Sequence, residues 1–343
     1  MKRLKKRKKP VSEQVRETSK KPVKKEKSIR FDKVVSTGST ILDLAISGGR
    51  VRGGGIPGGI LLEIFGPSAS GKTAVLAEIC SSAQSKGGQA KFQDGEARLD
   101  KEYAKIYGLS LKDNSEDYSR PQTVNEMFDE IHKWNPKNSN VINIVGSDSL
   151  AALSTELEME SSDKMGMKRA KDFSERTRKC CKLIAEKNWL VACTNQLREG
   201  QYGETTPGGK AIPYYSSLRI RVKEIKKVEK EKIVYNVKQK KHTGIQSSCY
   251  IKKSTIDDPY RTAEPIFIMF NYGIDDIRGN LQWLKTNTKA TMYNAIDKEY
   301  QVLDAAVLYI ERMNYENELR EKVIDLWQKI EEKFKVDRKP KAR

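Results

Sequence analysis

Eight consecutive residues form a pattern that could hold the phosphates of a nucleotide. They are Gly66, Pro67, Ser68, Ala69, Ser70, Gly71, Lys72 and Thr73. The apolar run at 60–65 predicts a buried strand before them, and residues 74–80 predict a helix after them. In that context the backbone N–H groups and the helix N-terminus face one anion. We expect Lys72 to reach the β- and γ-phosphates and the Thr73 hydroxyl to bind Mg²⁺, so the chain should bind a nucleoside triphosphate.

Carboxylates that could serve such a site follow two other apolar segments. Asp148 ends the run at 141–148 and is a candidate for the Mg²⁺ shell, although a strand-end aspartate can also cap the next helix. Glu96 follows a strand that we expect to lie beside the strand of the phosphate loop. It is the preferred general base for the attacking water. Asp94 could take that role instead, or could serve the structure.

A neutral amide, Gln196, ends a further apolar strand. Such a group can hydrogen-bond a γ-phosphate and respond to its loss without adding charge, which would make Gln196 a switch. The alternative is an ordinary surface amide at a strand end.

The elements that must position these groups alternate between strands and helices. Strands are predicted at Ala90–Asp94, Val141–Asp148 and Trp189–Asn195, and helices at about 73–86, 99–107, 122–134 and 167–187. This alternation predicts an α/β fold with a mostly parallel sheet covered on both faces. After residue 216 the alternation of strands and helices stops, and consecutive strands with short connections predict an antiparallel extension of the sheet. Its consecutive strands are expected at Ser217–Lys223, Lys232–Lys238, Ser248–Lys252 and Pro265–Phe270.

Composition divides the chain into three parts. Residues 1–30 hold 14 Lys or Arg against three Glu, so this tail is predicted to be disordered. It could contact phosphates, act as a localisation signal or confer solubility. Residues 31–275 form the predicted core. Residues 276–343 are predicted to be a small, mainly helical region with a basic tail. An apolar stripe in this region would form its own core, and the alternative is a helix that binds a partner. The stripe is Leu319, Val323, Leu326, Trp327, Ile330 and Phe334.

The overall charge indicates a polyanionic partner. Lys and Arg outnumber Asp and Glu by 65 to 46, giving a net charge of +19. Nucleic acid is the commonest partner of such a chain, although a merely soluble basic protein is the alternative. Five cysteines without a C-x-x-C pair and two histidines favour neither a disulfide framework nor a metal cluster. We expect an intracellular protein, because no apolar run could span a membrane and no secretion signal is present.

Together these residues resemble the RecA family of DNA recombinases, including its phage branch. The similarity runs from about Val35 to Gly273. The segments that carry it are Ser36–Ser39, the phosphate loop, Asp94–Asp100, Asp148–Leu153, Asn195–Arg198 and Gly208–Ala211. The resemblance implies an ATP-dependent recombinase that forms filaments on single-stranded DNA, pairs it with double-stranded DNA and exchanges strands. A single-strand-binding protein or a mediator could assist it.

The resemblance also implies roles for individual residues. It implies that Lys72, Glu96 and Gln196 have catalytic roles. It also implies that Thr73 and Asp148 bind the metal. Asp100 and Tyr103 would contact adenine. Either Lys252 or Lys253 would reach across a subunit boundary to the γ-phosphate. Two loops would hold DNA; the candidate contacts are Lys164, Met165, Lys168 and Arg169 in the first, and Arg198, Tyr202, Gly208, Gly209 and Lys210 in or beside the second.

Two other functions remain open at this point. One is an accessory DNA-binding ATPase that loads another recombinase, and the other is a hexameric helicase with the same core fold. The chain also departs from the bacterial members of the family, since its last residues are basic and its second loop is shorter.

Overall fold

The computed structural model describes residues 31–111, 116–153, 166–200, 203–207, 211–335 and 338. Its main feature is a nine-stranded mixed sheet. In spatial order the strands are β13 (Gly273–Ile274), β12 (Thr262–Met269), β11 (Val237–Ser254), β10 (Leu218–Val234), β3 (Ile60–Gly66), β7 (Leu190–Gln196), β6 (Ile144–Asp148), β4 (Ala90–Asp94) and β5 (Tyr118–Ser119). The six strands from β10 to β5 pair in parallel, whereas β11, β12 and β13 pair antiparallel. The predicted α/β class is confirmed.

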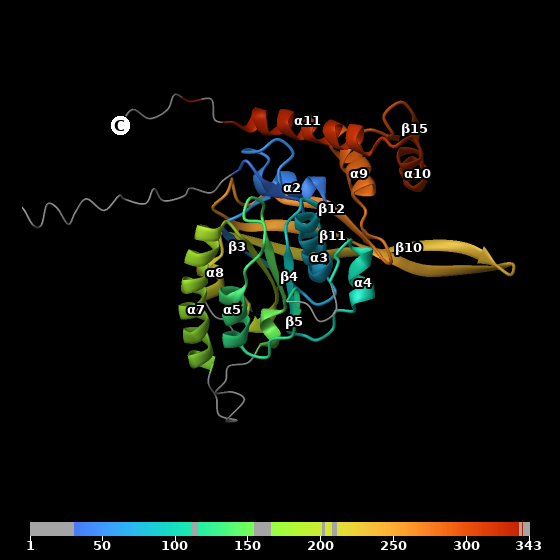
Figure 1. Cartoon of the computed structure of the whole chain (residues 1–343). Coiled ribbons are helices and arrows are strands. Elements are labelled where there is room, and N and C mark those ends of the chain that lie inside the picture. The colour runs from blue at the N-terminus through green and yellow to red at the C-terminus, as the bar shows by residue number, and fades with distance from the viewer. Residues whose placement is uncertain are drawn as a thin grey trace, which may run out of the picture.

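The sheet has a hydrophobic core on each face. Successive residues of a strand point to opposite faces, and in β3 Ile60, Leu62 and Ile64 join one core while Leu61 joins the other. The helices α2 (Thr40–Ser47), α3 (Lys72–Ser85) and α4 (Lys101–Ile106) cover the first face. The helices α5 (Val124–Lys133), α7 (Gly166–Lys187) and α8 (Ala211–Tyr215) cover the second (Figure 1). This two-sided burial explains why the parallel strands are apolar throughout.

Helix α5 shows how local sequence sets the element boundaries. Thr123 accepts a hydrogen bond from the Glu126 N–H, and the Glu126 side chain accepts one from the Thr123 N–H, which forms a capping box. Met127, Phe128 and Ile131 then lie on one buried stripe at helical spacing. The four helices predicted between residues 73 and 187 are confirmed as α3, α4, α5 and α7, and each end lies within two residues of its predicted position.

The antiparallel extension differs from the prediction. Two long strands, β10 and β11, replace the first three predicted ones and form a single hairpin. The segment Lys232–Lys238, predicted as one strand, contains the end of β10, a turn at Tyr235–Asn236 and the start of β11. Tyr235 and Asn236 there have φ values of 50° and 61°, which suit a two-residue hairpin loop. The outer half of the hairpin extends beyond the rest of the molecule (Figure 1).

The C-terminal helices pack on the main body. They are α9 (Asp276–Thr288), α10 (Leu303–Met313) and α11 (Glu316–Phe334), with the short strands β14 (Tyr293–Asn294) and β15 (Glu299–Tyr300) between the first two. From the predicted stripe, Leu319, Val323 and Trp327 join the core that contains α2 rather than a core of their own. Phe334 is 81% exposed and lies outside that core. Among the described residues, no helix is both long enough and apolar enough to cross a membrane.

Candidate functional site

The phosphate loop connects β3 to α3 at the carboxyl edge of the sheet. Gly71 precedes α3 with a φ of 99°, and a Cβ atom there would lie 2.2 Å from Ile268 Cδ1, so only glycine fits. The Lys72 amine donates to the backbone carbonyls of Gly66, at 3.1 Å, and Pro67, at 2.6 Å. Burial lowers the pKa of Lys72, while Asp148 and Glu96 oppose that shift. The amine is therefore aimed into the loop that phosphates would fill.

Two oxygen ligands suitable for a divalent cation meet beside this loop. The Thr73 hydroxyl donates to Asp148 Oδ2 over 2.6 Å, and the Thr194 hydroxyl donates to Asp148 Oδ1. Burial raises the pKa of Asp148, and these two hydrogen bonds oppose the rise. Mg²⁺ prefers oxygen ligands of these kinds, together with substrate phosphates. Thr73 and Asp148 thus fit the predicted metal role.

Glu96 and Gln196 are in direct contact, although 100 residues separate them. Glu96 Oε1 accepts hydrogen bonds from Gln196 Nε2, at 3.1 Å, and from Ser149 Oγ, at 2.6 Å. Glu96 Oε2 forms an ion pair of 3.1 Å with Arg98. The side chain of Glu96 is only 18% exposed. The proposed base and the proposed switch therefore form one unit, which Ser149 helps to hold.

The position of Glu96 corrects one expectation. Its strand, β4, is not beside β3, because β7 and β6 lie between them. Glu96 still reaches the site, since parallel strands bring their carboxyl ends to one edge of the sheet. Asp94, the alternative base, is buried and occupied elsewhere. It accepts hydrogen bonds from the N–H groups of Arg98 and Leu99 and from the Tyr118 hydroxyl, so it shapes the turn after β4.

The predicted adenine contacts lie at the start of α4. Asp100 caps this helix by accepting a hydrogen bond of 2.9 Å from the Glu102 N–H. Tyr103 is 39% exposed, and its ring meets the Tyr107 ring edge-on at 5.5 Å. An exposed aromatic face at this position is available for stacking on a base.

The two candidate lysines on β11 have different surroundings. The Lys253 amine donates to the carbonyls of Pro213, at 2.9 Å, and Tyr214, at 2.7 Å, in α8. Burial lowers the pKa of Lys253, and the nearby Arg219 lowers it further. Lys252, one residue earlier, is exposed. The structure thus separates a lysine used within the subunit from one that faces outward.

Most of the predicted DNA contacts cannot be placed. Lys164, Met165, Tyr202, Gly208, Gly209 and Lys210 lie outside the described residues. The backbone of Lys168 and Arg169 belongs to α7, whose described part begins at Gly166. Arg198 starts β8 (Arg198–Gly200), which pairs with β9 (Gly203–Thr205), so the described parts of the second loop form a hairpin where the sequence alone indicated a polar loop.

A buried polar link near the second loop was not predicted. Asn195 Nδ2 donates to Glu63 Oε1, at 2.9 Å, and to the Pro207 carbonyl, at 3.0 Å. Glu63 is fully buried in β3 and pairs with Arg219 over 2.5 Å. The sequence contains one indication of this link, which is the glutamate within the apolar run of β3. A charge that is buried with such a strand needs a partner of opposite charge or hydrogen-bond donors. The link joins the residue before Gln196 to the end of the second loop.

A phosphate loop with carboxylates and an amide at the carboxyl edge of a mostly parallel sheet defines a P-loop ATPase. Residues 6–275 match the RecA N-terminal domain. The chain is similar to the protein RecA of Clostridium perfringens strain 13, with 34% identity over 254 residues, covering 72% of this chain and 67% of that protein. It is also similar to the protein RecA of Thermus thermophilus, with 34% identity, covering 71% and 69% of the two chains. The chain belongs to the RecA family.

This membership confirms the function class predicted from the sequence. RecA-family proteins are DNA-dependent ATPases, and the chain is an ATP-dependent recombinase that catalyses strand exchange in recombination and repair. Its relatives bind DNA and form filaments. The helicase and the accessory mediator are correspondingly disfavoured.

Proposed function

We propose that the Glu96–Gln196 pair couples the nucleotide state of this recombinase to its grip on DNA. The observation that carries this proposal is the 3.1 Å hydrogen bond between Gln196 Nε2 and Glu96 Oε1. While that bond exists, the amide is engaged with the carboxylate. When a triphosphate occupies the loop, Gln196 can donate to the terminal phosphate instead, and Glu96 can then accept a proton from the attacking water.

Both ATP and Mg²⁺ suit the residues of the loop. Gly66 and Gly71 let the loop pack closely on the neighbouring strands, because a Cβ atom at Gly66 would lie 2.1 Å from the Val222 carbonyl oxygen and one at Gly71 would strike Ile268. Lys72 would contact the β- and γ-phosphates, while Thr73 and Asp148 would hold the metal. A bound Mg²⁺ would supply charge neutralisation on the phosphate oxygens. Asp100 and Tyr103 would hold adenine.

The change at Gln196 on ATP binding would be transmitted to the DNA-binding loop through the buried hydrogen bonds of Asn195. Asn195 is the next residue along β7 and hydrogen-bonds both Glu63 and the Pro207 carbonyl. A movement of Gln196 away from Glu96 would change the backbone of Asn195, and with it the end of the second loop. The loop would then hold single-stranded DNA more firmly when ATP is bound than when it is absent.

In a filament the site would be completed by the neighbouring subunit. We assign the contact across the boundary to Lys252, because Lys253 is already bound to two carbonyl groups of α8. The two loops would face single-stranded DNA, and double-stranded DNA would be the second substrate. The chain would work with DNA inside a bacterium or a phage-infected cell, assisted by a single-strand-binding protein or a mediator.

We further propose that the chain belongs to the phage branch of the family. The support is the short second loop and the strongly basic residues 1–30. A strand-exchange assay on single-stranded DNA that is covered with single-strand-binding protein tests this assignment. A requirement for an added mediator supports the phage branch, and efficient exchange without one argues against it.

The coupling is tested by Glu96→Ala and Gln196→Ala, with Glu102→Gln as an exposed control in the same region. Binding of a fluorescent single strand is measured with ATP, with ADP and without nucleotide. Glu96→Ala should slow ATP turnover and keep the tighter DNA binding in ATP. Gln196→Ala should remove the difference between ATP and ADP while nucleotide still binds. If Gln196→Ala retains the full difference, the proposed coupling is wrong.

A further inference from the structure

The two oxygen atoms of the Glu96 carboxylate have different partners. Oε1 accepts hydrogen bonds from Gln196, at the end of β7, and from Ser149, just after β6. Oε2 lies 3.1 Å from the guanidinium of Arg98, two residues further along the turn that follows β4. The side chain of Glu96 is 18% exposed, whereas that of Arg98 is 80% exposed. The carboxylate is therefore held at both oxygens, and Arg98 holds it from the solvent side.

The backbone that carries this ion pair is tied to the sheet. Asp94, which is buried at the end of β4, accepts hydrogen bonds from the N–H groups of Arg98, at 3.1 Å, and Leu99, at 2.9 Å. The Glu96 N–H donates to the backbone carbonyl of Asp148 over 3.2 Å. Both residues of the pair thus start from fixed positions, so the contact belongs to the framework of the site.

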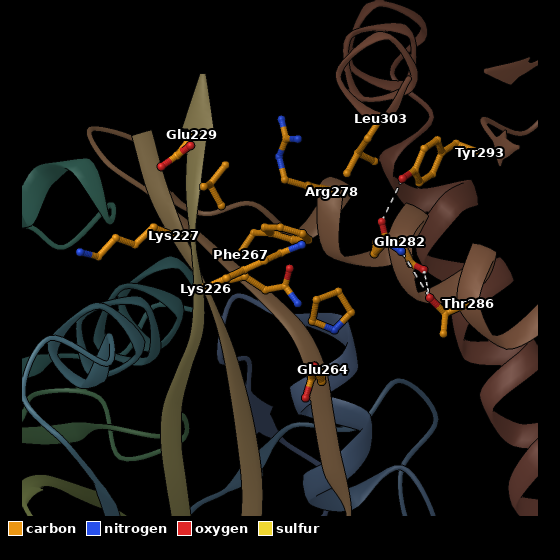
Figure 2. A pocket seen from close by; sticks show the side chains of 13 residues that line it. Lys226, Lys227, Glu229, Glu264, Phe267, Arg278, Gln282, Thr286, Tyr293 and Leu303 are labelled. Atoms are coloured by element: carbon orange, nitrogen blue, oxygen red, sulfur yellow. Dashed lines mark hydrogen bonds between the residues drawn. The ribbon is translucent and has the colours of Figure 1, made fainter. Parts of the chain in front are cut away.

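An arginine that serves packing in this chain has a different environment. Arg278 of α9 lines a pocket of about 610 Å³ beside the β10–β11 hairpin (Figure 2). Its side chain is 9% exposed and contacts two carboxylates, Asp275 at 2.8 Å and Asp304 at 2.6 Å. Arg98 is instead exposed and contacts the carboxylate of Glu96. Because an exposed ion pair adds little to stability, this contact bears on the chemistry of Glu96 more than on folding.

Negative charge gathers around Glu96. Burial raises the pKa of Asp148, and the nearby charges of Glu96 and Asp94 raise it further. A triphosphate in the loop would add more charge of the same sign. A carboxylate that must face a triphosphate is stabilised by a cation on its other oxygen, because the cation reduces the repulsion between the two anions. Arg98 is a cation in that position.

Arg98 can also prevent the carboxylate from rotating. The last torsion of a glutamate side chain is broad and roughly two-fold, so an unrestrained carboxylate presents either oxygen. If Gln196 leaves Oε1 when a triphosphate binds, one hydrogen-bonding position on that oxygen becomes vacant. Ser149 still holds Oε1 and Arg98 still holds Oε2, so the vacant position keeps its direction. The attacking water would meet the same acceptor atom in every turnover.

We propose that Arg98 is a positioning residue for ATP hydrolysis, which holds Glu96 by Oε2 so that Oε1 accepts the proton. The proposal rests on the proposed role of Glu96 as general base. The proton moves from the attacking water to Oε1 while the water oxygen bonds to the terminal phosphorus and the bond from that phosphorus to ADP breaks. The proton then passes to solvent. Arg98 exchanges no proton, because a guanidinium stays charged in proteins.

The test compares Arg98→Gln with Arg120→Gln, which removes the same charge from the same edge of the sheet. Arg120 is exposed and donates to the Tyr118 hydroxyl over 2.9 Å, so it serves as the matched control. Arg98→Lys is the conservative variant, since an ammonium can still reach a carboxylate oxygen as a point charge. ATP turnover on single-stranded DNA is measured against ATP concentration. Filament assembly and binding of a fluorescent ATP analogue are measured in parallel.

Arg98→Gln should lower kcat by about three- to fivefold, the upper part of the range for an exposed ion pair. The KM for ATP, binding of the analogue and filament assembly should change no more than in the control. Arg98→Lys should recover most of the lost turnover, and Arg120→Gln should change kcat by less than about 1.5-fold. An unchanged or higher kcat in Arg98→Gln would overturn the proposal. An equal fall in Arg120→Gln would do the same, since general loss of charge would then explain the effect.

A double-mutant cycle with Glu96→Gln separates a failure of this proposal from a failure of the proposed base. Single-turnover rates are measured for both single variants and for the double variant. With Glu96→Gln in place, Arg98→Gln should have no further effect, because the two residues act as one unit. Additive effects would mean that Arg98 does not act through Glu96, so the positioning role would be wrong while the base stands. If Glu96→Gln alone keeps full turnover, the base assignment and the positioning role both fail.

Discussion

Replacing Glu78 by glutamine should make the protein more stable at alkaline pH. Glu78 lies on α3, and its Oε1 atom accepts a hydrogen bond of 3.1 Å from the Ile274 N–H. Burial raises the pKa of Glu78 from 4.5 to about 7, and the nearby Asp276 adds to the rise. The folded state therefore keeps a proton that the unfolded chain releases above pH 4.5. Stability is lost as the pH rises from 4.5 through 7.

The size of this effect follows from the two pKa values. Each pKa unit corresponds to about 1.36 kcal/mol, so ionising Glu78 in the folded state costs about 3 kcal/mol at pH 8. Glu78→Gln keeps an oxygen that can accept from Ile274 and removes the ionisation. Its advantage over the unmodified chain should grow by roughly 2–3 kcal/mol between pH 5 and pH 8.

Urea unfolding at pH 5, 6, 7 and 8 measures this difference. Glu318→Gln, a change at an exposed position of α11, is the control and should show a difference that is nearly independent of pH. The reasoning is refuted if Glu78→Gln behaves like the control, or if its advantage shrinks as the pH rises.

Three other predictions, made with five substitutions, have defined outcomes. Lys72→Ala should weaken binding of a fluorescent ATP analogue by at least about tenfold, because a charge-assisted contact is lost. Lys252→Ala should slow ATP turnover in filaments while isolated subunits still bind nucleotide, whereas Lys253→Ala should mainly lower thermal stability; the reverse pattern would exchange their roles. Trp327→Ala should cost about 3–5 kcal/mol in urea unfolding, and Phe334→Ala, at an exposed position, less than about 0.5.

The parts of the site that depend on neighbouring residues could be predicted from the sequence. The phosphate loop is set by glycines at fixed spacing between a strand and a helix, so Lys72 and Thr73 needed no knowledge of the rest of the fold. Their roles in nucleotide binding stay predictions that the experiments above test. The hydrogen bond between Glu96 and Gln196 could not be predicted in this way, because it depends on β7, β6 and β4 lying side by side.

The outer half of the β10–β11 hairpin, Glu229–His242, which we call the arm, was missed for a different reason. A strand is recognised when one face is buried and the sequence alternates accordingly. Both faces of the arm are exposed, so lysine and glutamate alternate there without an apolar face and only fragments of β10 and β11 were predicted. The stripe on α11 shows a similar limit. The spacing of its apolar residues indicated a buried face, but the sequence did not indicate that α2 packs against this face.

Strand β10 runs from the nucleotide loop into the arm, with register irregularities at Glu224/Lys226 and Val228/Glu229 on the way. Leu218–Arg221 pair with β3 just before Gly66, and the Val222 carbonyl then lies against Gly66 itself. From Val222 the same strand continues to the tip, a length of roughly 40 Å at about 3.4 Å per residue. A tilt of about 5° at the loop would displace the tip by about 3–4 Å. A fluorophore at position 235 would therefore magnify small changes beside Gly66 into a measurable displacement.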